Sequence, residues 1–313
     1  MKAYTMIDKW FVIINPVSGR NKGGKLWHKI KPLLTEGGIS FDFAITEYVD
    51  HASEITGNAA KAGYTNFLII GGDGTANDVV NGICNSSIDI NLFTIAMLSA
   101  GTGNDWVRTI GKCPSLNSIV NSLKQRSTFL HDVGICSYHK NDTIRKRYFI
   151  NIVGLGFEGH VAKRLFEEKS IFRGTKLQYQ IAILRSLFIY KHTQMKITVD
   201  GVTTELTTLS IAAGIGKYNG GGLKQLPESK YDDGLLDMTV IGNMSKLKMV
   251  ISLPKLQSGV HTKMKEVKTF RGKEISIESK PNVFIDADGE YLGTTAIQIS
   301  IANNKLQILK WRD

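Results

Sequence analysis

Short apolar runs alternate with segments of helical periodicity through the first 132 residues of the chain. The segments over residues 26–34 and 52–62 repeat apolar residues at the spacing of one helix face. The apolar runs that flank them cover residues 10–14, 41–45, 67–70 and 93–98. Strands that alternate with helices are typical of a parallel sheet with helices on both faces. We therefore expect an α/β domain over residues 1–132, doubly wound around a mostly parallel sheet.

Beyond residue 132 the pattern changes to short runs of the kind that form hairpins. Three pairs of runs are spaced as antiparallel neighbours, namely 195–199 with 206–212, 274–278 with 283–285, and 296–301 with 306–309. Helical segments interrupt them near residues 157–168, 177–190 and 246–253. We expect an antiparallel β-sandwich domain over residues 133–301. An alternative for the last residues, 302–313, is that they pack back on the first domain.

Three polar loops that contain glycine follow apolar runs of the first domain, at residues 15–19, 71–75 and 101–105. The carboxyl ends of parallel strands lie at one edge of a sheet, so we expect these loops to converge there. Their glycines leave backbone N–H groups open to a polyphosphate, and Asp73 would repel that phosphate unless a cation lies between them. Thr75 is expected to cap a helix over residues 76–81. One such loop alone is an ordinary turn, whereas the convergence of three indicates phosphate binding.

Residues 154–159, Gly-Leu-Gly-Phe-Glu-Gly, match the dinucleotide-binding fingerprint and follow an expected strand over residues 148–153. The fingerprint also requires an acidic residue about 20 positions later, at the end of the next strand. Residues 175–178, Thr-Lys-Leu-Gln, occupy that neighbourhood and lie within an expected helix. The motif therefore favours a packing turn, or a turn in a substrate cleft, over a NAD site.

Asp-Gly pairs, which commonly form hairpin turns, occur at four places in the chain. The pair at residues 200–201 lies between two alternating runs and is interpreted as a turn only. Asp286, Asp288 and Glu290 instead place three carboxylates at period two, on one face if the strand is regular. Like charges at that spacing are unfavourable without a metal or a functional demand. The Asp232-Asp233-Gly234 turn offers oxygen ligands suited to a hard cation.

The composition is that of a folded protein with room for two ordinary domains, with 313 residues, 42% hydrophobic and 21% charged. The formal net charge of +11 favours an anionic partner, which could be nucleotide phosphates, an acidic membrane surface or nucleic acid. RNA-binding aromatic motifs, zinc-finger spacings and long basic tails are absent from the sequence. Their absence disfavours nucleic acid as the partner.

The sequence favours a protein of the reducing cytoplasm. No apolar run approaches the roughly 20 residues that span a bilayer, and residues 1–8 lack the apolar region of a signal peptide. Cys84, Cys113 and Cys136 are odd in number and widely spaced. The stretch Lys163–His192 mixes basic and apolar side chains, which fits either two helices with solvated basic faces or a surface that contacts lipid.

Together these motifs resemble the diacylglycerol kinase catalytic-domain family, which includes soluble bacterial lipid kinases and the sphingosine and ceramide kinases. The match follows the family's order and covers nearly the whole chain. The Gly-Gly-Asp-Gly-Thr run is shared with NAD kinases and phosphofructokinase-like folds, whereas the full set is more specific. The matching residues are Asn15-Pro16-x-Ser18-Gly19, Gly71-Gly72-Asp73-Gly74-Thr75-x-Asn77, Gly101-Thr102-Gly103-Asn104-Asp105, Asp132-Val133-Gly134, Gly154-x-Gly156-Phe157, Asp233-Gly234-x-Leu236 and Asp288-Gly289-Glu290.

The resemblance implies an N-terminal nucleotide-binding domain of NAD-kinase-like and phosphofructokinase-like fold, a C-terminal β-sandwich, and an active site in the cleft between them. Asp288 would be the general base for the lipid hydroxyl. Glu290 and Asp105 would support the magnesium–phosphate network, and Asp73 is grouped with them as catalytic. One departure is Asp78, where the family commonly carries glutamate, and this leaves the spacing of any contact there open.

The resemblance also implies ATP as co-substrate and Mg²⁺ as cofactor. The residues that would contact ATP are Asn15, Pro16, Val17, Ser18, Gly19, Thr46, Gly71, Gly72, Asp73, Gly74, Thr75, Asn77 and Thr102. The backbone carbonyls of Lys230 and Leu235, together with the Asp233 carboxylate, would hold a structural magnesium.

We therefore expect a cytoplasmic lipid kinase that meets an anionic membrane surface peripherally. It would transfer the γ-phosphate of ATP to a lipid hydroxyl, with diacylglycerol as the first choice of substrate. Kinases of another lipid, such as sphingosine or phosphatidylglycerol, and NAD kinases are alternatives within the same class. A non-catalytic protein that binds nucleotide or nucleic acid is the alternative from another class. The sequence leaves a homodimer open.

Overall fold

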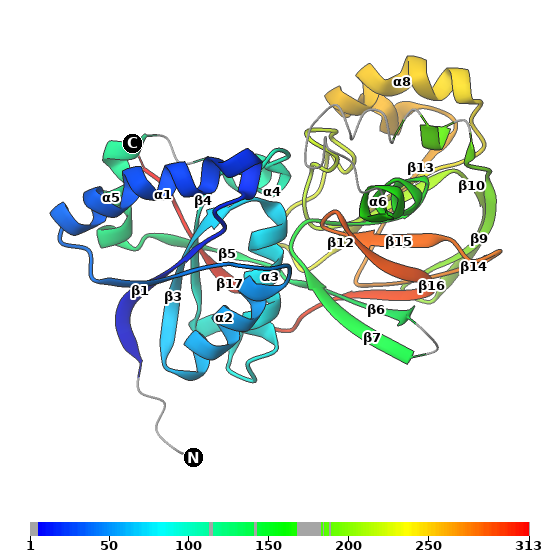
Figure 1. The fold of residues 1–313 in the computed structure, drawn as a ribbon. Helices are drawn as coiled ribbons and strands as arrows, with labels where there is room; N and C mark the ends of the chain where they lie inside the picture. Colours follow the sequence, from blue (N-terminus) through cyan, green and yellow to red (C-terminus); the bar gives the residue numbers. More distant parts are fainter. Residues whose placement is uncertain are drawn as a thin grey trace. The chain divides into compact units, whose positions relative to one another are not determined.

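The computed structural model divides into two compact units (Figure 1). Unit 1 comprises Met1–Asp132 and Asn303–Asp313, and unit 2 comprises Val133–Ala302. The residues that the structure describes are 6–112, 115–140, 143–167, 183, 185–187 and 189–312.

Unit 1 is built on a six-stranded sheet in the order β2-β1-β3-β4-β17-β5. The first four of these strands are parallel to their neighbours. The strands are β1 (Ile7–Ile14), β2 (Phe41–Ile45), β3 (Tyr64–Gly71), β4 (Thr94–Ser99), β5 (Thr128–His131) and β17 (Leu306–Leu309). This arrangement confirms the predicted α/β fold with a mostly parallel sheet.

Helices cover both faces of this sheet (Figure 1). The helical elements are α1 (Ser18–Glu36), α2 (His51–Lys61), α3 (Asp73–Cys84), η1 (Ile90–Leu92), α4 (Asp105–Ile110) and α5 (Leu116–Gln125). Alternate strand residues such as Ile14, Ile70 and Leu98 join Trp27 of α1 and Leu123 of α5 in one buried cluster. The residues between them are buried too, because α2 and α3 lie on the other side of the sheet (Figure 1). Burial on both faces explains why these strands are continuous apolar runs.

The C-terminal strand β17 completes the sheet of unit 1. It pairs parallel with β4 and antiparallel with β5, so the hairpin predicted between residues 296–301 and 306–309 is wrong. Leu306, Ile308 and Leu309 are buried, and the apolar surface between β4 and β5 provides a better partner than the preceding strand. The last residues of the chain therefore belong to the sheet that the first residues begin.

Unit 2 is antiparallel and β-sandwich-like, as predicted. Its main sheet has the order β10-β9-β14-β16-β15-β8-β11-β12-β13, and β6 pairs with β16 and β7. The strands are β6 (Gly134–Lys140), β7 (Thr143–Phe149), β8 (Ile152–Gly156), β9 (Thr193–Val199), β10 (Val202–Thr208), β11 (Ser210–Gly214), β12 (Leu236–Ile241), β13 (Val267–Gly272), β14 (Glu274–Lys280), β15 (Phe284–Ala287) and β16 (Glu290–Ile301).

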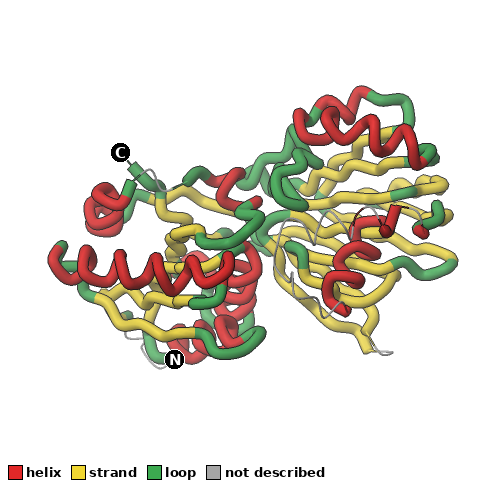
Figure 2. The backbone as a smooth tube through the Cα atoms, turned by 45° about the horizontal axis from the view of Figure 1, so that its top comes forward, coloured by secondary structure: helices red, strands yellow, loops and turns green. Residues whose placement is uncertain are grey.

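One core cluster links nine of these strands, with Tyr138, Leu155, Ile211 and Ile285 among its members. The helical elements α6 (Phe157–Glu167), α8 (Lys246–Ser258) and η2 (Val260–Lys263) lie outside the strands (Figure 2). Phe157 and Val161 of α6 form a second, smaller cluster with Leu187 and Leu209.

The structure confirms one predicted hairpin of unit 2 and contradicts another. β9 and β10 pair across Asp200-Gly201, whose left-handed φ angles of 46° and 83° fit a two-residue hairpin turn. The hairpin predicted between 274–278 and 283–285 is wrong, because β16 lies between β14 and β15. The alternation of apolar and polar residues shows that a segment is a strand, but it does not determine which other strand pairs with it. The helix predicted over residues 177–190 lies largely outside the described residues.

None of the described helices is both long and apolar enough to cross a membrane.

Replacement of Ile308 by alanine should destabilise unit 1 although the residue lies five positions before the last residue of the sequence. Its side chain is 2% exposed, and a cavity at such a site lowers the free energy of unfolding by about 2–5 kcal/mol. All four tryptophans, at positions 10, 27, 106 and 311, belong to unit 1, so tryptophan fluorescence during urea unfolding reports on this unit. Leu130→Ala on the neighbouring strand is the control, since Leu130 is 53% exposed. Equal effects of the two variants would contradict the packing of β17.

Candidate functional site

The loops that follow β1, β3 and β4 meet at one edge of the sheet in unit 1. Ile14 pairs with Ile70, and Gly71 pairs with Ser99. Beyond these pairs the Asn15 N–H donates to the Ile70 carbonyl at 2.9 Å, and the Ala100 N–H donates to the Gly71 carbonyl at 2.6 Å. The parallel register therefore brings the three glycine-containing loops together.

Glycine is required where these loops touch. A Cβ on Gly101 would lie 2.7 Å from the Gly72 Cα, and a Cβ on Gly72 would lie 3.0 Å from the Gly101 Cα. Gly19 has a φ of 56°, and a Cβ there would collide with the Ala100 carbonyl oxygen. Contacts between backbones cannot be relieved by a side-chain rotation. The glycines thus allow three backbones to approach one another and to present their polar groups at one edge.

Asn15 connects the loop after β1 to the loop after β3 by a hydrogen bond. Its Nδ2 donates to Thr75 Oγ1 at 3.0 Å, and among the described residues no donor reaches its buried Oδ1. The prediction that Thr75 caps a helix over 76–81 is wrong. The helix α3 already begins at Asp73, with Gly72 as its N-cap, so Thr75 lies inside the first turn and its hydroxyl group bonds to Asn15.

Asp73 connects the loop after β3 to the loop after β4 by hydrogen bonds. Its Oδ2 accepts from the Asp105 N–H at 3.0 Å, and its Oδ1 accepts from the Trp106 N–H at 3.1 Å. The carboxylate therefore caps α4, where the helix dipole favours negative charge. Burial raises the pKa of Asp73, and the backbone donors oppose that rise.

Asp105 lies close to Asp73 at the same edge. A Cβ on Gly103 would lie 3.2 Å from Asp73 Oδ2 and 3.3 Å from Asp105 Oδ2, and Asp105 is 6% exposed. Arg108 Nε lies 3.7 Å from Asp105 Oδ1. Two carboxylates beside loops rich in N–H groups match the oxygen donors that Mg²⁺ prefers, so the residues fit the predicted cation.

The other residues predicted for nucleotide binding take different positions. The Thr46 N–H donates to the Ile14 carbonyl at 2.8 Å, which places Thr46 at the end of β2 on the same edge. Val17 and Thr102 are exposed. Asn77 is wholly buried, and Asn81 Nδ2 donates to its Oδ1 at 3.0 Å. Asn77 therefore lies behind the loop rather than on its surface.

Sequence reasoning missed the basic side chains beside these loops. Gly19, Arg20 and Asn21 have left-handed φ angles, so regular α1 begins only after them. Arg20 is exposed in this irregular turn, and Arg108 Nη2 donates to the Gly103 carbonyl at 3.4 Å. The signal was present as the run Ser-Gly-Arg-Asn-Lys, since a cation directly after a phosphate-type loop is chemically suited to phosphate.

In unit 2, Asp288 lies at the turn between β15 and β16. Asp288 and Gly289 have φ angles of 51° and 85°, which are typical of a type I′ hairpin. The expectation that Asp286, Asp288 and Glu290 share one strand face is therefore wrong, because the strand ends at Ala287. The Asp288 carboxylate accepts backbone N–H groups from Ile150, Asn151 and Ile152 at 2.9, 3.0 and 3.1 Å. Those bonds fix its orientation at the entry to β8.

A second pair of carboxylates, Glu158 and Asp286, lies next to Gly154. A Cβ on Gly154 would lie 2.6 Å from Glu158 Oε2 and would also collide with Asp286 Oδ1. Glu158 Oε1 accepts from Ser210 Oγ at 3.1 Å and from Gln225 Nε2 at 2.9 Å, and its Oε2 accepts from Asn219 Nδ2 at 3.3 Å. No described residue donates to Asp286 Oδ1.

Both carboxyl groups of this pair favour the protonated state. Burial raises the pKa of Glu158 to about 8, and the three side-chain donors lower it only in part. Burial also raises the pKa of Asp286 well above its ordinary value, and the negative charge of Glu158 adds to that rise. A perturbed pair beside a glycine turn can hold or pass a proton. Sequence reasoning treated residues 154–159 as a packing or cleft turn and did not pair Glu158 with Asp286.

The predicted structural magnesium residues lie in the loop before β12. The Asp233 Oδ1 accepts from the Leu235 N–H at 3.1 Å, and its Oδ2 forms an ion pair with Arg271, which also lies 3.6 Å from Asp237 Oδ1. Burial raises the pKa of Asp237. Arg271 supplies positive charge to both carboxylates, and the oxygen donors of this loop are of the type that a hard cation binds. The Lys230, Asp233 and Leu235 assignment stays a prediction.

Comparison with known proteins places both units. A sequence model of the diacylglycerol kinase catalytic domain matches residues 9–136. The YegS C-terminal NAD kinase beta sandwich-like domain matches residues 151–310. A protein of Mycobacterium tuberculosis named diacylglycerol kinase is 26% identical, over 98% of this chain and 96% of its own length.

Two solved structures share the fold. A diacylglycerol kinase structure from Bacillus anthracis superposes with a TM-score of 0.70 at 21% identity, and each chain is covered to 97%. The yeast NADH kinase has a TM-score of 0.57 at 12% identity, over 97% of this chain and 84% of its own. These similarities confirm the NAD-kinase-like architecture expected from the sequence.

The raised pKa of Glu158 predicts a pH-dependent stability. Between the ordinary pKa of 4.5 and about 8, the unfolded chain releases the Glu158 proton while the folded chain keeps it. The free energy of unfolding should therefore fall as pH rises through this window, by up to about 1.4 kcal/mol per pH unit. Glu158→Gln should flatten the fall, as measured by urea unfolding followed by circular dichroism at pH 5 to 8. Glu205→Gln, at an exposed position of β10, is the control and should leave the slope unchanged. A wild-type slope in Glu158→Gln would refute the assignment.

Proposed function

The chain belongs to the diacylglycerol kinase family and is a lipid kinase, and on that premise we propose that it transfers the γ-phosphate of ATP to diacylglycerol. The product would be phosphatidic acid. The observation that carries the proposal is the convergence of three glycine-containing loops with Asp73 at the carboxyl edge of β1, β3 and β4. Phosphoryl transfer depends on positioning and on neutralisation of charge, and this edge is suited to both.

The loops of unit 1 would hold the nucleotide. Glycine removes side chains from the backbone beside the phosphates, and the α3 N-terminus adds a favourable dipole. Residues 15–19 and 71–75, with Thr46 and Thr102, are the proposed contacts, while buried Asn77 would support them from behind. Arg20 is proposed as an additional cation for the phosphates. Bound Mg²⁺ would neutralise phosphate charge, and Asp73 and Asp105 are the residues suited to hold it.

Asp288 of unit 2 would accept the proton of the lipid hydroxyl. As the hydroxyl oxygen attacks the γ-phosphorus, its proton passes to the carboxylate, and ADP leaves. The three backbone N–H groups that donate to Asp288 would fix its orientation, and the exposed Glu290 lies two residues later, after Gly289. The proposed reaction therefore requires groups from both units.

A protein of this activity would work in the cytoplasm at the surface of a membrane, because its substrate resides in lipid. The net charge of +11 supports attraction to anionic lipids. ATP, Mg²⁺ and a membrane lipid are thus the proposed partners.

Gly101→Ala should weaken ATP binding. The new Cβ would lie 2.7 Å from the Gly72 Cα, so the loops after β3 and β4 must separate and their N–H groups must leave the phosphate edge. We expect at least a tenfold rise in the ATP Kd, measured by isothermal titration calorimetry. Gly57→Ala is the matched control, because its Cβ would have no contact closer than 3.7 Å and alanine favours the helix. Unchanged ATP affinity in Gly101→Ala would argue against this edge as the nucleotide site.

Asp288→Asn should abolish phosphatidic acid formation while nucleotide binding remains. Asparagine tolerates the left-handed φ of 51°, and its Oδ1 can still accept from Asn151 and Ile152. Loss of a general base commonly lowers turnover by about 10²–10⁴-fold. The measurement is transfer of radiolabelled phosphate from ATP to diacylglycerol in detergent micelles, with calorimetry for ATP.

The same assay tests the substrate. Sphingosine, phosphatidylglycerol and NAD replace diacylglycerol in parallel reactions with the wild-type protein. Turnover of another lipid with none on diacylglycerol would move the assignment to that lipid, and product from NAD alone would overturn it. Near-normal turnover in Asp288→Asn would reject the base. Tight ATP binding with no turnover on any acceptor would favour a nucleotide-binding protein without catalysis.

A further inference from the structure

Helix α8 lies on unit 2 by a half-buried face and has no fully buried side chain. Its inner residues Lys248, Met249, Ser252, Leu253 and Leu256 are partly covered. Met249 packs against the small cluster around Phe157 and Leu209. The helix is thus held from one side only.

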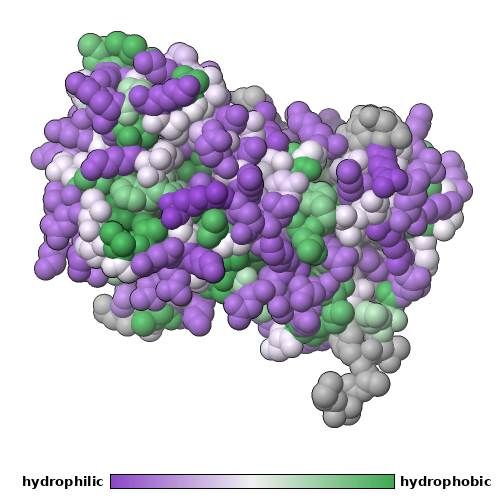
Figure 3. Space-filling view, turned by 180° about the vertical axis from the view of Figure 1, so that it is seen from behind, coloured by the Kyte–Doolittle hydropathy of each residue, from purple (hydrophilic) through white to green (hydrophobic). Residues whose placement is uncertain are grey.

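The outer face of α8 is apolar and exposed. Leu247, Val250 and Ile251 are 71%, 41% and 66% exposed, and exposed Pro254 continues the row at helical spacing. In the space-filling view, hydrophobic residues bordered by hydrophilic ones gather at the end of unit 2 where α8 lies (Figure 3). Leaving neighbouring aliphatic side chains in water is unfavourable, and such a patch marks a contact surface.

Positive charge surrounds this row. Residues 246–268 contain six lysines and a single acidic residue, Glu266, and α8 itself contains no acidic residue. Exposed aliphatic side chains elsewhere in unit 2 do not combine the two features. Val202 lies in β10, which contains no basic residue, and Ile144 precedes Arg145-Lys146-Arg147 in β7 without an aliphatic row. The combination of an apolar row with lysines is therefore local to α8 and the segment that follows it.

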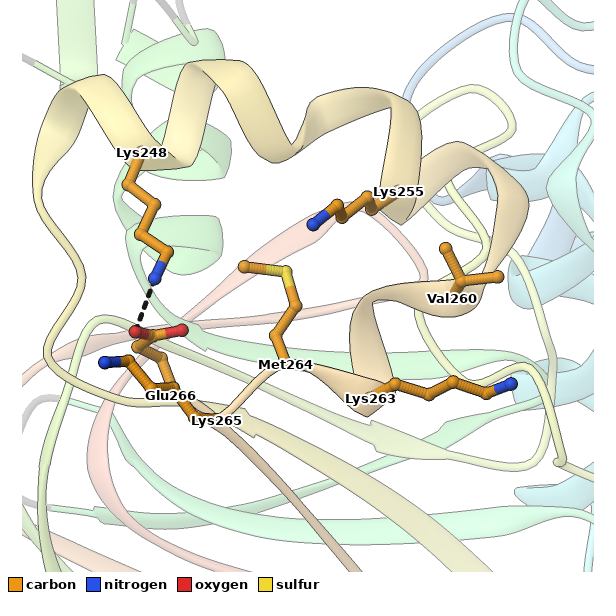
Figure 4. Close-up of a pocket in the computed structure, with 7 residues that line it drawn as sticks. All are labelled: Lys248, Lys255, Val260, Lys263, Met264, Lys265 and Glu266. Atoms are coloured by element: carbon orange, nitrogen blue, oxygen red, sulfur yellow. Dashed lines mark hydrogen bonds and ion pairs between the residues drawn. The ribbon is translucent and has the colours of Figure 1, made fainter.

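A pocket of about 390 Å³ opens between α8 and the segment around η2 and the start of β13. Lys248, Lys255, Lys263 and Lys265 line it together with Glu266 and Met264. Lys248 Nζ lies 2.5 Å from Glu266 Oε1 and neutralises it. Figure 4 shows Lys255 extending from α8 over the pocket while Met264 rises into it from below. The remaining lysines make the pocket cationic.

From this arrangement we propose that the outer face of α8 docks on an anionic phospholipid membrane. Leu247, Val250 and Ile251 would enter the boundary between head groups and acyl chains, and the lysines of α8 and the pocket would contact phosphate groups of the lipids. The inference rests on the proposed function, because it locates the surface by which a lipid kinase meets its substrate.

Charge complementarity selects the membrane as the occupant. A second copy of the chain across a two-fold axis would bring the same lysines face to face, which is repulsive. A polynucleotide would satisfy the lysines but would leave the aliphatic row without a partner, since base recognition uses aromatic stacking or hydrogen bonds. An anionic bilayer satisfies both the apolar row and the charge.

The test is sedimentation of the full-length protein with vesicles of phosphatidylcholine alone or with 30% phosphatidylglycerol. The wild type should bind the anionic vesicles, and its affinity should fall as salt rises. Leu247→Ser/Ile251→Ser should lower the partition coefficient at least tenfold, because the apolar row no longer leaves water. Lys255→Ala/Lys263→Ala should lower it roughly fivefold per lysine, since each is worth about that factor near a charged surface.

Matched variants elsewhere in unit 2 are the controls. Ile144→Ser/Val202→Ser removes equally exposed aliphatic side chains, and Lys140→Ala/Lys146→Ala removes exposed lysines. Wild-type binding by the α8 variants, or equal losses in the controls, would overturn the proposal. So would binding that is the same on neutral vesicles. A change in molar mass by light scattering with unchanged vesicle binding would assign the face to a second copy and also overturn it.

A second measurement does not depend on affinity. Ile251→Trp should be quenched by brominated lipids beyond the signal of the four native tryptophans, whereas Val202→Trp should not. The absence of extra quenching at position 251 would overturn the proposal even if the vesicles bind. These experiments need no turnover, and the micellar assay needs no vesicle, so failure of docking and failure of the proposed kinase activity are distinguishable.

Discussion

The close approach of the backbones after β3 and β4 is the constraint on which the rest of unit 1 depends. Gly72 and Gly101 leave no space for a Cβ between them, and this contact sets where α3 and α4 begin. With those starts fixed, Asp73 can cap α4, and Asn15 can reach Thr75. Side chains larger than glycine at these two positions would push the loops apart. Asp73 could then no longer cap α4, and the hydrogen bond between Asn15 and Thr75 would break. The proposed phosphate-binding edge is therefore a consequence of backbone packing more than of any single polar side chain.

Unit 2 controls its carboxylates by two opposite physical means. Asp288 is surrounded by backbone donors at the entry to β8, which favour a charged group. Glu158 and Asp286 are placed in a region where burial dominates, so their protonated forms are favoured. Residues of one chemical type thus lie in different environments within one sheet. A base needs the first environment, whereas a proton-holding pair needs the second.

The parallel sheet of unit 1 could be predicted from sequence because its strands are buried on both faces and their loops carry short-range signals. Residues such as Asn15, Asp73 and Gly101 could be grouped into one site from sequence because the parallel topology brings the ends of their strands together. Other features depend on partners distant in sequence. The insertion of β16 between β14 and β15, and of β17 between β4 and β5, leaves no local trace. The pairing of Glu158 with Asp286 became visible only when the register placed Asp286 opposite Gly154.

The surroundings of Asp73 and Asp105 bear on when a metal ion would be needed. Asp73 receives two backbone donors, and Asp105 lies beside Arg108, so the negative charge at this edge is offset in part within the protein, while burial still raises the pKa of Asp73. A polyphosphate would add several further charges next to both carboxylates, and the repulsion between these like charges would call for a cation between them. The demand for a divalent cation would therefore arise with the nucleotide. On the proposed function, magnesium would enter this edge as part of the nucleotide complex, and the fold of unit 1 would stand without it.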